Sequence, residues 1–238
     1  MSALTVTYLH GGYRPAVDVV RGIDMSVEPG TAVGLIGRNG AGKTCLAELL
    51  IGRNKATRGT IRLGDDELTG LRPDGRVRRG LSLVPEGRLV FPQLTVRENL
   101  ITAAYGAGRK LDPAEIRGIE ERFEVLGRKR NDRAGGMSGG EQQLLAIARA
   151  LVQHPRVIVL DEPSLGLAPV MVHTVRDVLA SLLADGLALV LMEQNRALVA
   201  ALCSAVHVIQ DGVISLTTTP EKLESGEELG DLLLGEDA

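Results

Sequence analysis

The segment Gly37–Thr44 constrains the fold more than any other part of this sequence. It reads Gly-Arg-Asn-Gly-Ala-Gly-Lys-Thr and fits the pattern G-x-x-x-x-G-K-[ST]. A mostly apolar run over Thr31–Ile36 precedes it, and helical spacing of leucines follows over Lys43–Ile51. In such a loop, glycines let backbone N–H groups curl around phosphate oxygens, and the helix presents its positive N-terminus to the same anion. The alternative is a glycine-rich turn that only joins a strand to a helix.

Each side chain of this loop has an expected contact with a nucleoside triphosphate. We expect Lys43 to neutralise the β- and γ-phosphates and Thr44 to place its hydroxyl on Mg²⁺. Cys45 follows at the helix start, where a thiol can be acidified, but a small buried side chain is the favoured interpretation. The nucleotide-binding candidates of this segment are Gly37, Arg38, Asn39, Gly40, Ala41, Gly42, Lys43, Thr44 and Cys45.

Two adjacent acids end the apolar run Val157–Leu160. Ligands of open parallel sheets bind outside the carboxyl ends of the strands, and two acids there are costly unless they meet a cation or do chemistry. We therefore expect Asp161 to share the Mg²⁺ shell with Thr44, and Glu162 to polarise an attacking water as the catalytic base. Solvated acids in a strand-end turn are the alternative.

A second candidate anion site lies in Met137–Gln143, which reads Met-Ser-Gly-Gly-Glu-Gln-Gln. Ser138 and Glu141 have the spacing of a capping box at the start of an amphipathic helix. Gly139 and Gly140 are expected to leave the backbone bare at its positively polarised N-terminus. A well-capped helix with no ligand is the alternative.

Length and composition favour one α/β domain of 238 residues with an aliphatic core, since apolar residues make up 44% of the chain and aromatic residues 2%. Strand and turn patterns dominate residues 1–86, charged helical segments dominate 87–152, and the α/β pattern resumes over 153–238. We predict a helical subdomain inserted into an α/β core. The polar, acidic tail carries one apolar patch at Leu232–Leu234.

Charge and hydropathy exclude several classes of protein. The net charge of −3 argues against nucleic-acid binding, and the arginine clusters at 72–79 and 128–133 are interpreted as solvated. Two distant cysteines fit a reducing compartment. The longest strongly apolar run, Leu187–Met192, is far shorter than the ~20 residues of a membrane-spanning helix, so we expect any membrane role to depend on a partner.

The phosphate loop, the Ser-Gly-Gly-Glu segment and the strand ending in Asp-Glu, in that order, resemble the nucleotide-binding subunits of ABC transporters. Ser138 precedes Asp161 by 23 positions, a distance typical of that family. The resemblance implies a P-loop NTPase (RecA-like) core, an N-terminal antiparallel β subdomain and an inserted helical signature subdomain. It also implies ATP hydrolysis with Mg²⁺ in a head-to-tail dimer, in which the signature residues Ser138, Gly139, Gly140 and Glu141 face the partner's ATP.

The same resemblance implies further contacts and partners. Tyr13 would stack on adenine, with Tyr8 as the competitor, and either could instead be an ordinary packed tyrosine. The expected partners are a second ABC ATPase subunit, identical or different, two membrane permease subunits and an extracytoplasmic solute-binding protein. The expected location is the cytoplasmic face of the membrane.

A finer resemblance is to the LivF-type subunits of branched-chain amino acid importers. It rests on Val84–Arg88, Phe91-Pro92, Leu94–Leu100, Asp161–Pro169 and Met192–Asn195. It implies import of branched-chain amino acids or a related small polar solute. The stretch Glu86–Leu100 would then receive a coupling helix of the permease through Phe91, Pro92 and Leu94, unless these side chains pack internally.

Three positions depart from the general family pattern. Glu86 stands where most members have a glutamine that reaches Mg²⁺, Gln194 stands where most have a histidine at the γ-phosphate, and Ala168 replaces an aspartate. By resemblance, Glu86 and Gln194 are catalytic candidates, and Glu86 is also a metal candidate. The departures predict weaker transition-state stabilisation and a heterodimer with a more usual partner. Two other functions remain open: a soluble ABC ATPase in DNA repair, translation or chromosome structure, and a catalytically quiet regulatory cassette.

Overall fold

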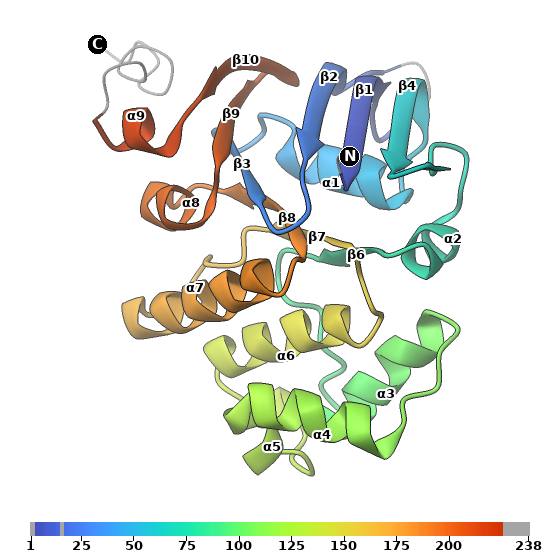
Figure 1. The fold of residues 1–238 in the computed structure, drawn as a ribbon, viewed down its shortest axis with the longest axis vertical. Coiled ribbons are helices and arrows are strands. Elements are labelled where there is room, and N and C mark those ends of the chain that lie inside the picture. Colours follow the sequence, from blue (N-terminus) through green and yellow to red (C-terminus); the bar gives the residue numbers. More distant parts are fainter. Residues whose placement is uncertain (1–2, 15–16, 226–238) are drawn as a thin grey trace.

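The computed structural model describes residues 3–14 and 17–225, so the predicted apolar patch of the tail lies outside the described residues. The helices and strands follow the order shown in Figure 1. They are β1 (Leu4–Gly11), β2 (Val20–Val27), β3 (Ala32–Ile36), α1 (Lys43–Ile51), β4 (Ala56–Leu63), β5 (Asp66–Glu67), α2 (Pro73–Arg78), β6 (Leu81–Val84), α3 (Val96–Gly106), α4 (Pro113–Arg122), α5 (Glu124–Arg128), the 3₁₀ turn η1 (Ala134–Gly136), α6 (Gly139–Leu151), β7 (Val157–Asp161), α7 (Pro169–Ala184), β8 (Ala188–Glu193), α8 (Arg196–Leu202), β9 (Ala205–Gln210), β10 (Val213–Thr218) and α9 (Pro220–Ser225).

Within the described ranges the strands form two sheets. The first has the order β2-β1-β4-β5 and is antiparallel. The second has the order β10-β9-β3-β8-β7-β6; strands β9, β3, β8, β7 and β6 run parallel, and β10 is antiparallel to β9. Register pairs Asp161 with Met192 and Ile36 with Glu193, so the carboxyl ends of β3, β7 and β8 meet at one edge.

Side chains of the parallel strands alternate between two aliphatic cores. On β7, Ile158 and Leu160 join the core shared with α3, α6, α7 and α8. Val157 and Val159 join the core that includes α1 and the antiparallel sheet. Because both faces are covered, these strands read as continuous apolar runs in the sequence. The predicted α/β class, with an antiparallel sheet beside the P-loop core, is confirmed.

Helices α3 to α6 gather in the lower part of the molecule in Figure 1, below α7 and the end of β6. Helix α6 also packs against β6 and α7, and thereby joins this helical region to the sheet. The boundaries of the three predicted parts, 1–86, 87–152 and 153–238, stay a prediction.

The interpretation of the arginines at 72–79 as solvated is wrong for Arg76. Its side chain is 1% exposed, and its guanidinium donates to the carbonyls of Leu49 and Leu50 at 2.7 Å each and to Thr69 at 2.7 Å. Burial lowers the pKa of Arg76 to about 10. The Leu49 carbonyl also accepts from the Gly52 N–H at 3.2 Å, so Arg76 adds a second donor there and supplies one to the Leu50 carbonyl in the last turn of α1. Arg76 therefore anchors the far end of the helix that begins at the phosphate loop.

Candidate active site

The phosphate loop joins β3 to α1 and depends on two of its glycines. A Cβ atom on Gly37 would lie 2.4 Å from the Ile209 carbonyl oxygen, so no larger residue fits there. Gly42, the N-cap of α1, has φ 109°, a conformation that other residues rarely adopt. The Lys43 side chain is 5% exposed and its Nζ donates to the Gly37 carbonyl at 2.7 Å. The loop therefore holds its lysine against its own backbone beside the N-terminus of α1.

Glu162 follows β7 in a strained conformation. Its φ is 49°, in the left-handed region, and a non-glycine residue there costs about 1–3 kcal/mol. Its N–H donates to the Met192 carbonyl at 2.8 Å, which ties the turn to the end of β8. Its carboxylate lies 3.3 Å from Lys43 Nζ. Strain of this kind persists where many surrounding contacts fix the backbone, and such conformations cluster at active sites.

Gln194 links the phosphate loop to Glu162. Its Nε2 donates to Asn39 Oδ1 at 2.7 Å and to Glu162 Oε1 at 2.9 Å. A neutral amide uses both of its N–H groups in this arrangement. The structure thus brings together three candidates that are far apart in the sequence.

Asp161 is 3% exposed, and burial, together with the charges of Glu162 and Glu86, raises its pKa to about 6. A hydrogen bond from Thr44 and the charge of Lys43 act in the opposite direction. Its Oδ1 is buried without a hydrogen-bond partner. Within the described residues no cluster of three or more His, Cys, Asp or Glu could hold a metal ion. An orphaned carboxylate oxygen beside a hydroxyl nevertheless fits Mg²⁺, which is commonly held by one or two protein oxygens together with substrate phosphates.

Lys43, Glu162 and Gln194 line a pocket of about 400 Å³, whereas buried Asp161 is not among its lining residues. Its lining residues are Tyr13, Val19, Asn39, Gly40, Gly42, Lys43, Thr44, Glu86, Glu162, Leu165 and Gln194. Tyr13 is 59% exposed at this pocket, whereas Tyr8, the competing tyrosine, is not among the lining residues and instead contacts His10 edge to face.

The interpretation of Cys45 as a small buried side chain is confirmed, whereas its contact with the nucleotide stays a prediction. Its side chain is fully buried in the core between α1 and the antiparallel sheet, and it does not line the pocket. Burial, and secondarily the charge of Glu48, raises the pKa of its thiol to about 11. The thiol is therefore inert, and only the backbone of Cys45 could face a phosphate.

The predicted capping box at Ser138 is confirmed. The Ser138 N–H donates to Glu141 at 2.8 Å, and the Glu141 N–H donates back to the serine hydroxyl at 3.4 Å. The expectation of a bare backbone is wrong for Gly140, because a Cβ there would meet Met171 of α7 at 2.6 Å. Gly139 is half-buried, and a Cβ there would lie 3.1 Å from the Arg88 guanidinium. None of these signature residues lines the pocket of about 400 Å³.

The ABC transporter family profile matches residues 20–165. The chain belongs to the ABC transporter family. It is 37% identical over 223 residues to BraG of Pseudomonas aeruginosa, a high-affinity branched-chain amino acid transport ATP-binding protein, covering 94% of this chain and 96% of that protein. It is 31% identical over 242 residues to LptB of Escherichia coli, a lipopolysaccharide export system ATP-binding protein, covering 100% of this chain and 99% of that protein. A nucleotide-free ATP-binding cassette from an ABC transporter has the same fold, with a TM-score of 0.85 over 95% of this chain and 94% of that chain at 24% identity.

Membership identifies the chain as an ATP-binding subunit and a transport ATPase of this family. No helix within residues 3–14 and 17–225 is long and apolar enough to cross a bilayer. The family works with membrane permease components.

Two residues beside the site of this ABC subunit were not predicted from the sequence as site residues. Glu193 ends β8, and its buried carboxylate accepts backbone N–H groups from two loops. Arg88 places its guanidinium at Gly139 and donates to the Leu165 carbonyl at 3.4 Å. An acid that directly ends an apolar strand was the available signal for Glu193. No sequence signal pointed to Arg88, because its two neighbours come from other segments.

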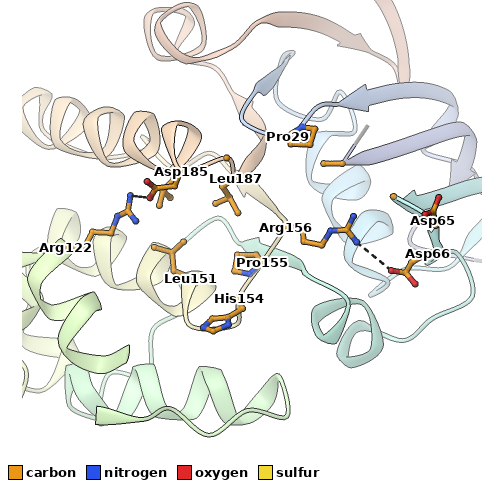
Figure 2. Close-up of a pocket in the computed structure, with 14 residues that line it drawn as sticks. Pro29, Asp65, Asp66, Arg122, Leu151, His154, Pro155, Arg156, Asp185 and Leu187 are labelled. Carbon is orange, nitrogen blue, oxygen red and sulfur yellow. Dashed lines mark ion pairs between the residues drawn. The ribbon is translucent and has the colours of Figure 1, made fainter. Parts of the chain in front are cut away.

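A larger cavity, of about 690 Å³, opens where the parallel strands begin rather than where they end (Figure 2). Pro29, Arg156 and Leu187, just before β3, β7 and β8, contribute to its lining. This cavity is not the ATP site of the subunit, because the phosphate loop and the acids of β7 lie at the opposite edge of the sheet.

Proposed function

We propose that this ABC subunit hydrolyses ATP to power an importer of branched-chain amino acids or a related small polar solute. The observation that carries the proposal is the 37% identity to BraG over 94% of this chain. The LivF-like segments that flank Glu86 and Asp161 add support. The proposed location is the cytoplasmic face of the membrane, beside two permease subunits and, in the full system, an extracytoplasmic solute-binding protein.

A second candidate is lipopolysaccharide export. LptB proteins are 31% identical over the whole of this chain, only slightly less similar than BraG. The two candidates need different permeases, because one solute is small and polar and the other is a large amphiphile. The ATP site is compatible with both, since this subunit would contact ATP rather than the solute.

The proposed chemistry assigns tasks to six side chains of the pocket and to Asp161 behind it. Lys43 neutralises the phosphates, Tyr13 stacks on adenine, and Glu162 accepts a proton from the water that attacks the γ-phosphate. Thr44, Asp161 and Glu86 would hold Mg²⁺, which would supply positive charge to stabilise the charge that develops on the phosphates. Gln194 would orient Glu162 through the 2.9 Å hydrogen bond from its amide.

The proposed active unit is a head-to-tail dimer. The signature residues at the N-terminus of α6 do not line the pocket of their own chain, and that absence supports a role toward a partner's ATP. Glu86, Gln194 and the exposed Ala168 distinguish this site from the usual family pattern, so the proposed partner is a different subunit with the more usual residues. If the purified chain alone dimerises with ATP and hydrolyses it as fast as a mixed dimer, the heterodimer is ruled out.

The proposed permease contact lies on the loop between β6 and α3. Phe91 is 42% exposed and Leu89 60%; Pro92 is exposed as well, whereas Leu94 is half-buried. Buried Asn99 fixes the loop, because its side chain accepts from the Phe91 N–H at 2.9 Å and donates to the Phe91 carbonyl at 3.0 Å. A pinned loop that presents apolar side chains outward suits docking of a helix.

The test is to capture the membrane partner with the tagged full-length subunit and reconstitute the complex in vesicles. ATP-dependent uptake of radiolabelled leucine, absent with the E162Q subunit, supports the import proposal. ATP-dependent extraction of lipopolysaccharide without leucine uptake supports the second candidate. Capture of nucleic acid or soluble partners in place of a membrane protein contradicts both.

A further inference from the structure

Glu193 is a buried acid within the described residues that the proposed chemistry does not use. It is 2% exposed, and no ion pair to its carboxylate is present among the residues that the structure describes. It ends β8 next to Ile36, the last residue of the strand that leads into the phosphate loop. A buried carboxylate without a cation needs other compensation, and here backbone N–H groups supply it.

The carboxylate divides its two oxygens between two loops. Oε1 accepts from the Ser164 N–H at 2.8 Å, in the turn that carries Glu162. Oε2 accepts from the N–H groups of Gln194 at 3.0 Å and Asn195 at 3.1 Å. One side chain therefore clamps the backbone on both sides of the contact between Glu162 and Gln194.

This clamp also bears on the strained backbone of Glu162. The φ of 49° places its side chain toward Lys43 and Gln194, and the Glu162 N–H is held by the Met192 carbonyl at 2.8 Å. The bond from Ser164 fixes the turn two residues later. With anchors on both sides of Glu162, the turn has no freedom to relax out of the left-handed region.

We propose that Glu193 is a positioning residue for ATP hydrolysis, which sets the geometry of Glu162 against Gln194 by accepting N–H groups from both loops. The inference rests on the proposed role of Glu162 as the base. Glu193 touches neither ATP nor water in this assignment, so its loss should slow the chemical step and leave ATP binding intact. Only an acceptor with two free oxygens suits the three N–H donors, and a glutamine would turn one oxygen into a donor.

The test uses the full-length subunit with Mg-ATP and compares Glu193→Gln, Glu193→Asp and Glu162→Gln. For E193Q we expect kcat to fall about 10- to 100-fold, the range expected when a catalytic group is displaced by about 1 Å. The KM for ATP and the ATP-dependent dimer on gel filtration should stay unchanged, because the lost interaction acts only in the transition state. E193D keeps two acceptor oxygens on a shorter side chain, and its kcat should lie between those of E193Q and the unmodified subunit.

The control is Glu115→Gln on α4, outside the site; its carboxylate also accepts a backbone N–H, from Asp112 at 3.1 Å, and in addition pairs with Arg109 at 2.6 Å and His154 at 2.7 Å. Its kcat should stay unchanged. If E193Q hydrolyses ATP at the full rate while E162Q is inactive, the role of Glu193 is overturned and the role of Glu162 stands. If both Glu193 variants lose ATP binding as well as kcat, Glu193 is a structural residue and the proposal is also overturned. If E162Q hydrolyses ATP at the full rate, Glu162 is not the base, and Glu193 then has no catalytic group to position.

Discussion

The two edges of the six-stranded sheet carry hollows of different kinds. Where the parallel strands begin, the cavity holds about 690 Å³, and four of its charged side chains form two ion pairs. Arg122 lies 2.6 Å from Asp185, and Arg156 lies 3.7 Å from Asp66 (Figure 2). Where the strands end, the pocket holds only about 400 Å³. Cavity volume therefore does not identify the ATP site.

The charges at the carboxyl edge are not fully compensated. Asp161 is buried with an unpartnered oxygen, and Glu162 has a left-handed backbone conformation. Both features cost free energy in the isolated subunit. At the opposite edge, the two ion pairs are partly exposed, so they contribute little to stability and their charges are neutralised. The fold maintains these unfavourable features only at the carboxyl edge, which marks that edge as the functional one. This difference between the two edges can be tested.

The largest expected effect is on hydrolysis by Glu162→Gln. Glutamine keeps the shape of the side chain but cannot accept the proton of the attacking water. We expect kcat to fall by about 10²- to 10⁴-fold, the usual contribution of a general base. ATP binding should persist, so gel filtration should show a stable ATP-dependent dimer. Unchanged hydrolysis would remove Glu162 from the base role and weaken the contrast between the two edges.

The second prediction concerns the stability cost of Asp161. Its pKa is about 6 in the folded chain and 3.8 without the fold, so between these pH values the folded state keeps a proton that the unfolded state has lost. The free energy of unfolding should therefore fall as pH rises from about 4 to 6. Above that window the ionised acid costs up to about 3 kcal/mol.

Asp161→Asn removes the charge and should raise the free energy of unfolding at pH 7.5 by up to about 3 kcal/mol. Urea unfolding with EDTA and without nucleotide measures this value. At pH 3.5 the variant and the unmodified chain should be nearly equally stable, because Asp161 is then neutral in the folded state and mostly neutral in the unfolded state. A variant that is less stable at pH 7.5 would show that the carboxylate is compensated after all.

The third prediction tests the amide of Gln194. Gln194→Ala removes the donor to Glu162, and a hydrogen bond worth about 1.4 kcal/mol corresponds to a tenfold loss of kcat. The KM for ATP should change less than kcat. Gln194→His supplies a ring N–H in place of the amide and can also carry a positive charge, so its kcat should equal or exceed that of the unmodified subunit. Equal rates for all three side chains would mean that the 2.9 Å contact has no role in hydrolysis.

Local patterns made much of the ATP site predictable. The phosphate loop, the acids after β7 and the capping box of α6 each depend on residues that are close in the sequence. The strands of the parallel sheet were visible because both of their faces are buried, which produces continuous apolar runs.

What could not be predicted depends on contacts between distant segments. Arg76 is buried only because α2 packs over the end of α1, and Gly140 is covered by Met171 from α7. Glu193 acts through the Ser164 backbone, 29 positions away. No periodicity or spacing rule encodes such contacts, since the tertiary fold alone brings the groups together.

The smallest expected effect is at the edge with the larger cavity. Asp185→Asn removes the negative charge of the pair with Arg122 but keeps an acceptor oxygen on a side chain that is 59% exposed. We expect the free energy of unfolding to fall by less than about 1 kcal/mol, with a smaller difference at high salt, and kcat to stay unchanged. Urea unfolding at two salt concentrations and a steady-state ATPase assay measure both quantities. A large loss of hydrolysis would mean that the edge where the strands begin communicates with the ATP site, and paired charges would then no longer distinguish a structural edge from a functional one.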